Sequence, residues 1–221
     1  MPTYDSISSL QAELIRKTVG GSVFIAPGTA PLITALTAKT GTAPNEVIDL
    51  VALPAGYEDL GYSTDDGFQF SSETAQSDIT SFQSIQPTRT DLISETVQMT
   101  VTAQETKMLT LGLYLGRDLS TVTPDANTGE VTVKRAERPA PRDYRVLCLG
   151  VDETASGPIY MARYMPKAKL TGKGEQAYSK ADAAVQYPLT FTGFKDSVAG
   201  TAEQWFFGGT GWQALLDEMG F

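Results

Sequence analysis

Residues 96–104, TVQMTVTAQ, decide the fold class of this chain. Polar and apolar side chains alternate along them, which is the pattern of a β-strand with one buried and one solvated face. The apolar set is Val97, Met99, Val101 and Ala103. The polar set is Thr96, Gln98, Thr100 and Thr102, none of which is charged. We therefore expect a strand whose solvated face is almost wholly threonine and glutamine.

A helix is predicted directly after this strand. Over residues 105–115 (ETKMLTLGLYL) the apolar spacing becomes helical, with Met108, Leu109 and Leu115 on one side. Gly116 is the expected end, because glycine readily adopts the left-handed conformation that terminates helices. Further along, the sequence predicts a turn at 124–129 and strands at 128–136, 144–151, 159–170 and 184–195.

Towards the N-terminus the pattern is also mostly that of short strands. Strands are predicted at 22–26 and 77–84, and residues 47–53 form an apolar patch. Asp65-Asp66-Gly67 is typical of a tight turn, so residues 60–63 and 68–71 are expected to pair as a hairpin. Residues 6–19 have apolar side chains at helical spacing and predict an amphipathic helix. Residues 28–44 fit an arm, a long loop or a marginal helix.

The last 17 residues, 205–221 (WFFGGTGWQALLDEMGF), change from aromatic to glycine-rich and then to a short helix that starts near Trp212. Two interpretations of the aromatic side chains stay open. They plug the core of their own subunit, or they dock against a neighbouring subunit, since aromatic residues are enriched at interfaces. The side chains concerned are Trp205, Phe206, Phe207, Trp212 and Phe221.

These elements together predict a mainly β fold. Many short strands without a strand–helix alternation favour a β-sandwich or barrel, with a flanking α-helix and a short C-terminal helix. The 27 threonines agree with this, because threonine favours strands. We expect residues 1–44 to form an N-terminal helix or arm and a loop. Residues 45–221 are expected to form the β-sandwich domain with the C-terminal aromatic segment.

The composition excludes several classes of site. The 221 residues include no histidine and one cysteine, which rules out a Ser-His-Asp triad, an imidazole metal site and an internal disulfide. A net charge of −9 argues against a basic nucleic-acid-binding face. The start has no secretory signal, and the apolar run 146–151 is far shorter than the roughly 18 residues that span a bilayer. We expect no enzyme activity, cofactor, metal ion or membrane contact.

Three short motifs and the single cysteine have an ordinary structural interpretation. Residues 171–174 (TGKG) lack the spacing of a phosphate loop, and residues 208–211 (GGTG) lack that of a dinucleotide loop. Residues 125–129 (DANTG) resemble the start of a calcium loop, but the closing glutamate is missing and a hairpin turn is favoured. Cys148 lies in an apolar run and is expected to be a small buried side chain.

Four segments carry a resemblance when they are taken in order. The first is 53–72 (LPAGYEDLGYSTDDGFQFSS) and the second is 78–89 (DITSFQSIQPTR). The third is the strand and helix of 100–115, and the fourth combines 163–172 with 204–221. Together they resemble the major tail (tail tube) proteins of long-tailed, siphovirus-type bacteriophages, in particular those of phages that infect actinobacteria. The resemblance covers residues 45–221 and rests on the order of the segments.

The resemblance implies a virion structural protein with a tail-tube-like β-sandwich or barrel. Six copies are then expected to form a ring whose sheets join into one closed barrel, and the rings to stack into the tube that delivers DNA to the host. The implied partners are further copies of the chain, the tape-measure protein, the tail terminator and distal tail proteins, and passing double-stranded DNA without specific binding. The implied location is the phage tail, after synthesis in the host cytoplasm. Another virion component (a tail terminator or a capsid decoration protein), an unrelated β-sandwich binding module and an enzyme remain the alternatives.

Two sets of residues are predicted to serve assembly. An uncharged wall offers no cationic contact to DNA phosphates, so we expect the lumen to be lined by Thr96, Gln98, Thr100, Thr102, Gln186, Thr190 and Thr192. The residues expected at subunit interfaces are Asp65, Asp66, Gly67, Phe82, Trp205, Phe206, Phe207, Trp212 and Phe221. The hairpin at 65–67, or the region 71–90 after it, is the expected contact between rings, and residues 1–44 are a further interface candidate.

Overall fold

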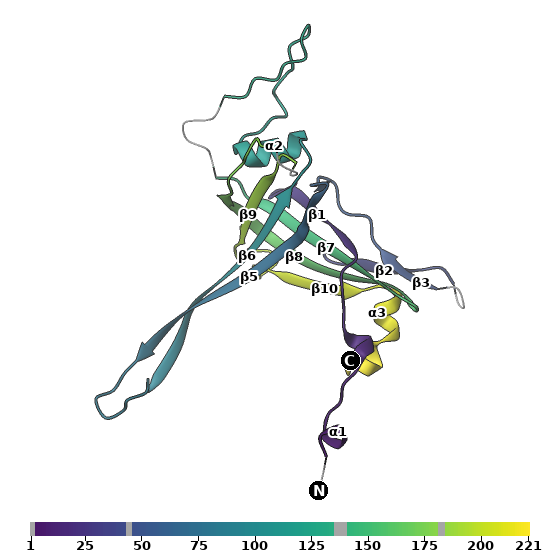
Figure 1. Cartoon of the computed structure of the whole chain (residues 1–221), viewed down its shortest axis with the longest axis vertical. Helices are drawn as coiled ribbons and strands as arrows, with labels where there is room; N and C mark the ends of the chain where they lie inside the picture. The colour runs from purple at the N-terminus through teal and green to yellow at the C-terminus, as the bar shows by residue number, and fades with distance from the viewer. Residues whose placement is uncertain (1–2, 43–45, 135–140, 181–183) are drawn as a thin grey trace.

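One large sheet organises the chain in the computed structural model, which describes residues 3–42, 46–134, 141–180 and 184–221 (Figure 1). Within those residues eight strands form an antiparallel sheet in the order β4-β1-β7-β8-β9-β6-β5, and β10 additionally pairs with β8. The strands are β1 (Gly20–Pro27), β4 (Glu58–Asp59), β5 (Ser63–Ile79), β6 (Arg89–Ala103), β7 (Tyr144–Thr154), β8 (Gly157–Lys173), β9 (Tyr187–Gly193) and β10 (Gln204–Gly208). The predicted mainly β fold is confirmed.

The remaining elements are short. A two-stranded sheet is formed by β2 (Thr37–Thr40) and β3 (Val47–Leu50). The helical elements are α1 (Tyr4–Ile7), the 3-10 turn η1 (Ala12–Leu14), α2 (Met108–Leu115), α3 (Thr210–Ala214) and α4 (Leu216–Met219). Among the described residues, no helix has the length and apolar character needed to cross a membrane.

The large sheet curls around an inner core. Val23 of β1 and Met99 of β6 belong to one buried cluster although other strands separate their own strands in the sheet. The segment after β4 bridges the remaining gap, because the N–H of Leu60 donates to the carbonyl of Val23 and the N–H of Gln104 donates to that of Tyr62. The helix α2 packs on the same cluster through Leu113, which is 1% exposed.

A second buried cluster covers the outer face of β7 and β8. Leu147 and Leu149 of β7 belong to this outer cluster, whereas Val146 and Cys148 belong to the inner one. The covering side chains come from residues 32–36 and 53–57, two segments that lie between β1 and β4 in the sequence. Both faces of β7 are therefore buried, which explains why its sequence is apolar without alternation.

The alternating pattern of residues 96–104 is confirmed. Met99, Val101 and Ala103 are at most 1% exposed, and their polar neighbours lie on the other face of β6. The helix predicted at 105–115 is α2, and Gly116 ends it with a φ of 70°. The strands predicted at 22–26, 144–151, 159–170 and 184–195 correspond to β1, β7, β8 and β9.

The helix predicted over residues 6–19 is wrong. The described chain in this region has only the short turns α1 and η1, separated by extended residues. Ile7, Leu10 and Ile15 are each more than 70% exposed. A short amphipathic helix gains most of its stability by burying its apolar face. No part of the described subunit covers these side chains, so the helical spacing alone does not produce a helix.

The hairpin predicted around Asp65-Asp66-Gly67 is also wrong. These residues lie inside β5, which pairs with β6 on both sides of them. The register shifts between the pairs Ser63–Ala103 and Phe68–Val101, which marks a bulge. Gly67 has a φ of 65°, a conformation that glycine adopts without steric cost. The turn that joins β5 to β6 is residues 80–88, so the strand predicted at 77–84 ends at Ile79.

The strand predicted at 128–136 is wrong where the structure describes it. Residues 128–134 form a turn and irregular chain, and residues 135–136 lie outside the described residues. The predicted turn before them is present. One carboxylate oxygen of Asp125 accepts the N–H groups of Asn127 and Thr128 at 2.9 and 2.8 Å. The motif that resembles a calcium loop is therefore a turn closed by its own carboxylate.

Candidate assembly surfaces

A continuous polar face runs across β5, β6, β9 and β8 on the side opposite the inner core. Thr100 of β6 lies between Gln69 of β5 and Thr190 of β9 in the register. On β8, the hydroxyl of Thr171 lies 2.7 Å from that of Thr192. We call this surface the threonine face; its members are Gln69, Ser71, Thr96, Gln98, Thr100, Thr102, Thr171, Thr190 and Thr192.

Six of the seven residues predicted for the lumen lie together on the threonine face. Thr192 is 6% exposed, and the other five are half-buried in the single subunit. Gln186 lies outside this group, because it precedes Tyr187, where β9 begins. None of the nine members of the threonine face is charged, but Glu73 of β5 borders the face, because it is opposite Thr96 in the register.

Lysine side chains of β8 adjoin the threonine face. Lys169 is opposite Thr192 in the register. The ammonium groups of Lys167 and Lys169 lie 3.5 and 3.8 Å from the carboxylate of Asp143, and Lys169 also lies 5.4 Å from the ring centre of Phe194. The sequence pattern of the two predicted wall strands gave no signal for these cations, because their position depends on which strand pairs with β9.

The β5–β6 hairpin projects far beyond the body of the subunit (Figure 1). Pairing of β6 with β9 begins at Val97, so residues 89–96 of β6 pair with β5 alone. The turn at its end, residues 80–88, contains no charged residue and carries Phe82 and Ile85, whose side chains are fully exposed. We call residues 80–88 the tip. Phe82, predicted at an interface, thus lies at the free end of the hairpin.

The bulge at Asp65-Asp66-Gly67 lies beside the C-terminal aromatic segment. A groove of about 710 Å³ is lined by these three residues and by Trp205 and Phe207 of β10. Asp65 and Asp66 are exposed. Two groups of predicted interface residues, which are far apart in the sequence, therefore share one surface.

Successive aromatic residues of β10 point to opposite sides. Phe206 packs against the outer buried cluster, whereas Trp205 and Phe207 remain 55% and 44% exposed. Phe207 stacks on Trp212 with ring centres 4.9 Å apart, and Phe221, 6.4 Å beyond Trp212, is 82% exposed. Phe206 thus helps to fill the core of its own subunit, and the other aromatic rings form a chain that reaches solvent.

Arg163 holds this region together, and no sequence pattern indicates this role. Its guanidinium donates two hydrogen bonds to the carboxylate of Glu203, at 2.7 and 3.0 Å. The guanidinium carbon also lies 4.1 Å from the ring centres of both Phe70 and Trp205. Glu203 in turn accepts the indole N–H of Trp205 at 2.9 Å. One cation therefore links β5, β8 and β10.

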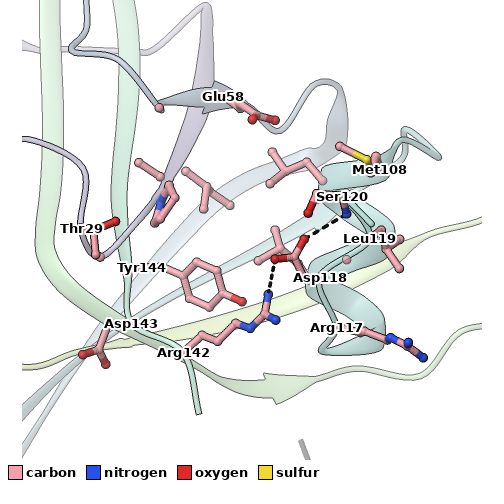
Figure 2. Close-up of a pocket in the computed structure, with 18 residues that line it drawn as sticks. Thr29, Glu58, Met108, Arg117, Asp118, Leu119, Ser120, Arg142, Asp143 and Tyr144 are labelled. Atoms are coloured by element: carbon pink, nitrogen blue, oxygen red, sulfur yellow. Dashed lines mark hydrogen bonds and ion pairs between the residues drawn. The ribbon is translucent and has the colours of Figure 1, made fainter. Parts of the chain in front are cut away.

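A cavity of about 650 Å³ lies where α2 meets the end of β1 and the start of β7 (Figure 2). We call it the helix-end cavity. Its apolar lining is Ile25, Ala26, Leu109, Leu113 and Leu119. These side chains belong to or adjoin the inner core, so the cavity is a place where that core opens towards the surface.

The charged groups of the helix-end cavity mostly have partners within the subunit. The carboxylate of Asp118 lies 3.7 Å from the guanidinium of Arg142 (Figure 2). Hydrogen bonds from the hydroxyl and then the N–H of Ser120 lower the pKa of Asp118. Arg117 donates to the carbonyl of Lys134 at 2.7 Å and points away from the other labelled side chains. The cavity therefore offers an apolar interior behind a rim whose charged groups, with the exception of Glu58, have partners within the subunit.

The cysteine thiol is buried, and the carboxylates do not form a metal site. Cys148 is 3% exposed, and its burial raises the pKa of its thiol. Such a thiol is unreactive, because the thiolate is the nucleophile. No group of three or more cysteine, aspartate or glutamate side chains in the described part of the chain is arranged to hold a metal ion.

Comparison with known proteins identifies the family. A family model described as phage tail tube protein matches residues 9–207. The matched region begins in the N-terminal arm and ends in β10, so it contains the large sheet apart from the last residue of β10, together with the threonine face and the tip. A search of curated proteins found no match. The chain therefore belongs to the phage tail tube protein family, whose members are structural proteins of the virion tail and not enzymes.

Proposed function

We propose that this subunit forms hexameric rings, which stack into the tube through which phage DNA reaches the host. The observation that carries the proposal is the threonine face, whose uncharged polar side chains continue over four neighbouring strands of a family member. The resemblance of residues 45–221 to major tail proteins of siphovirus-type phages supports six copies in a ring. Rings of this kind close around a lumen, and the threonine face is the wall of that lumen.

The free edge of β5 supports assembly through the sheet. In the described residues β5 is the last strand of the sheet and pairs with β6 alone, although it is 17 residues long. A long exposed edge offers unpaired N–H and C=O groups to another chain. In the proposed ring a neighbouring subunit pairs with or covers this edge, so that six sheets make one closed barrel.

The charges of the subunit suit passage of DNA without retention. Phosphate binding depends on free lysine and arginine side chains, and Lys167 and Lys169 of β8, which adjoin the threonine face, both lie beside Asp143. Six copies at −9 give each ring a charge of about −54, which repels DNA within a Debye length of about 8 Å. DNA is thus expected to slide along a wall that hydrates it and does not bind it.

The proposed contacts outside the ring use the parts that project from the sheet. The hairpin region 71–90 contacts the next ring, and the exposed aromatic side chains and the N-terminal arm contact neighbouring subunits. The tape-measure protein occupies the lumen before DNA does, and tail terminator and distal tail proteins cap the two ends. These partners follow from the resemblance to major tail proteins.

Negative-stain electron microscopy of the purified full-length chain tests the proposal. We expect hollow rings, or tubes of stacked rings, whose number increases with protein concentration. Isolated globular particles at high concentration, with no annular species, would contradict it.

A further inference from the structure

The tip and the helix-end cavity lie at opposite ends of the sheet. β1 ends at Pro27 and β7 starts at Tyr144, and both of these residues line the cavity. β6 runs from the tip at Arg89 towards α2, which forms another wall of the cavity. Figure 1 shows the β5–β6 hairpin and α2 at opposite ends of the subunit, so one subunit cannot place its tip in its own cavity. Two subunits in head-to-tail order would bring the two surfaces together.

The tip has the properties of a segment that inserts into a cavity on another subunit. Phe82 and Ile85 are fully exposed, and exposed apolar side chains of this size at the end of a projection are typical of contact sites. Hydrogen bonds close the base of the turn that carries them: the hydroxyls of Ser81 and Thr88 are 2.9 Å apart, and the N–H of Thr88 donates to the carbonyl of Ile79 at 2.9 Å. A preorganised tip loses little conformational entropy on binding.

The helix-end cavity has the size and the apolar lining needed to accept the tip. Its volume of about 650 Å³ exceeds what one phenylalanine and one isoleucine side chain occupy, and its inner lining is aliphatic. The tip has no charged residue between Ile79 and Arg89, so insertion buries no unpaired charge. The rim charges Asp118 and Arg142 already pair with each other, so they need no partner from the tip.

We infer that the tip of one subunit inserts Phe82 and Ile85 into the helix-end cavity of the next subunit along the tube. The inference rests on the proposed stacking of rings and names the site that receives the hairpin. Because the two surfaces differ and lie at opposite ends, the contact is heterologous and does not close, which is the requirement for a growing tube. A single tip buries much less than the roughly 1,000 Å² of a stable complex, so the contact holds only when several subunits of a ring engage together.

The N-terminal arm is the competing occupant, because it also leaves the sheet at the end away from the cavity. The N–H of Val19 donates to the carbonyl of Val151 at 2.8 Å, and Arg16 pairs with Asp152 at 3.3 Å, near the end of β7. The arm carries charged residues between its apolar ones, including Glu13 and Lys17. Its insertion would bury these charges, whereas the tip brings none, and this favours the tip.

Cysteine cross-linking in assembled tubes tests the inference. The variant Phe82→Cys/Met108→Cys places one thiol on the tip and one in the cavity wall, where Met108 is 58% exposed. We expect mild oxidation to give a ladder of disulfide-linked subunits on non-reducing gels, and the ladder to be absent for each single variant. The pair Ile85→Cys/Ser120→Cys is an independent repeat in case the first pair fails to assemble. The native Cys148 is buried and does not contribute.

The controls separate this inference from the proposed function. Phe82→Cys/Val198→Cys pairs the tip with an exposed residue outside the cavity lining, and it should give no ladder. Tubes that form without a ladder from either cavity pair would overturn the docking and leave the tube proposal intact. A ladder from Leu10→Cys/Met108→Cys, with none from the tip pairs, would overturn it in favour of the arm. A wild-type chain that forms no tubes would overturn both.

Discussion

The hydroxyl oxygens of Thr100 and Thr190 lie 3.3 Å apart across the pairing of β6 with β9. This contact joins two strands whose polar faces are more than 80 residues apart in the sequence. On the other side of the same strands, Met99, Val101 and Phe191 are buried in the inner core. These two strands thus separate a close-packed apolar face from a polar uncharged one.

A cation on the threonine face should make tubes retain DNA. In Thr100→Lys an ammonium group is added at a position with no carboxylate opposite it, since its register neighbours are Gln69 and Thr190. We expect Thr100→Lys tubes to retain double-stranded DNA in a sedimentation assay at low salt, and to release it as salt rises. The wild type and Ser197→Lys, which adds the same charge on an exposed loop, should retain none. Equal retention by both lysine variants would argue against a lumen position for Thr100.

Truncation in the inner core should destabilise the subunit itself. Met99 is 0% exposed, and Met99→Ala is expected to lower the free energy of unfolding by about 2–5 kcal/mol because it leaves a cavity. Leu92→Ala removes a similar side chain from the projecting hairpin, where Leu92 is 64% exposed, and should change that energy by less than about 0.5 kcal/mol. Urea unfolding of the two variants measures the difference. Similar losses of unfolding free energy in Met99→Ala and Leu92→Ala would contradict the stabilising role of the inner core.

The ion pair between Arg163 and Glu203 should contribute more than the exposed ion pairs do. Its side chains are 21% and 11% exposed, and Arg163→Ala is expected to cost about 1.5–3 kcal/mol of unfolding free energy. Arg89→Ala breaks the pair with Asp91, whose side chains are 68% and 45% exposed, and should cost at most about 1 kcal/mol. Urea unfolding followed by tryptophan fluorescence gives both values. An Arg163→Ala cost no larger than that of Arg89→Ala would contradict the linking role of this cation.

Stability of the unassembled subunit should be nearly constant from pH 8 to pH 5. The chain has no histidine, and backbone N–H groups lower the pKa of Asp125 and of Asp196 from the ordinary value of 3.8. A folded-state pKa below the unfolded one gives stability that is complete above the unfolded value and is lost as pH falls through the folded value. The melting temperature should therefore fall only below about pH 4. A fall in the melting temperature between pH 7 and pH 5 would contradict the lowered pKa values of these two aspartates.

Sequence periodicity correctly predicted strands with one buried and one exposed face. It failed where the secondary structure depends on a surface that covers the apolar side chains. At residues 96–104 one face meets the core, so the period of two is visible. At residues 6–19 the helical spacing is equally clear, but Ile7, Leu10 and Ile15 have no covering surface in the described subunit. An apolar pattern records that a face is to be buried, and the partner that buries it can lie outside the chain.

The predicted position of the long hairpin is wrong for a related reason. Asp65-Asp66-Gly67 has the residues of a tight turn, yet the same strand β6 lies opposite both flanks, and the glycine serves a bulge. The real turn at residues 80–88 contains no glycine, and its one strong turn residue is Pro87. The roles of Arg163 and Asp143 also depend on the strand order, which a local pattern does not contain.

Cryo-electron microscopy of the tube formed by the 221-residue chain would show directly which surface of the tube carries the threonine face. We expect six subunits in each ring and a hollow tube with the side chains of Thr100 and Thr190 on the lumen wall. A reconstruction with these side chains on the outer surface of the tube, or a filament without a lumen, would contradict it.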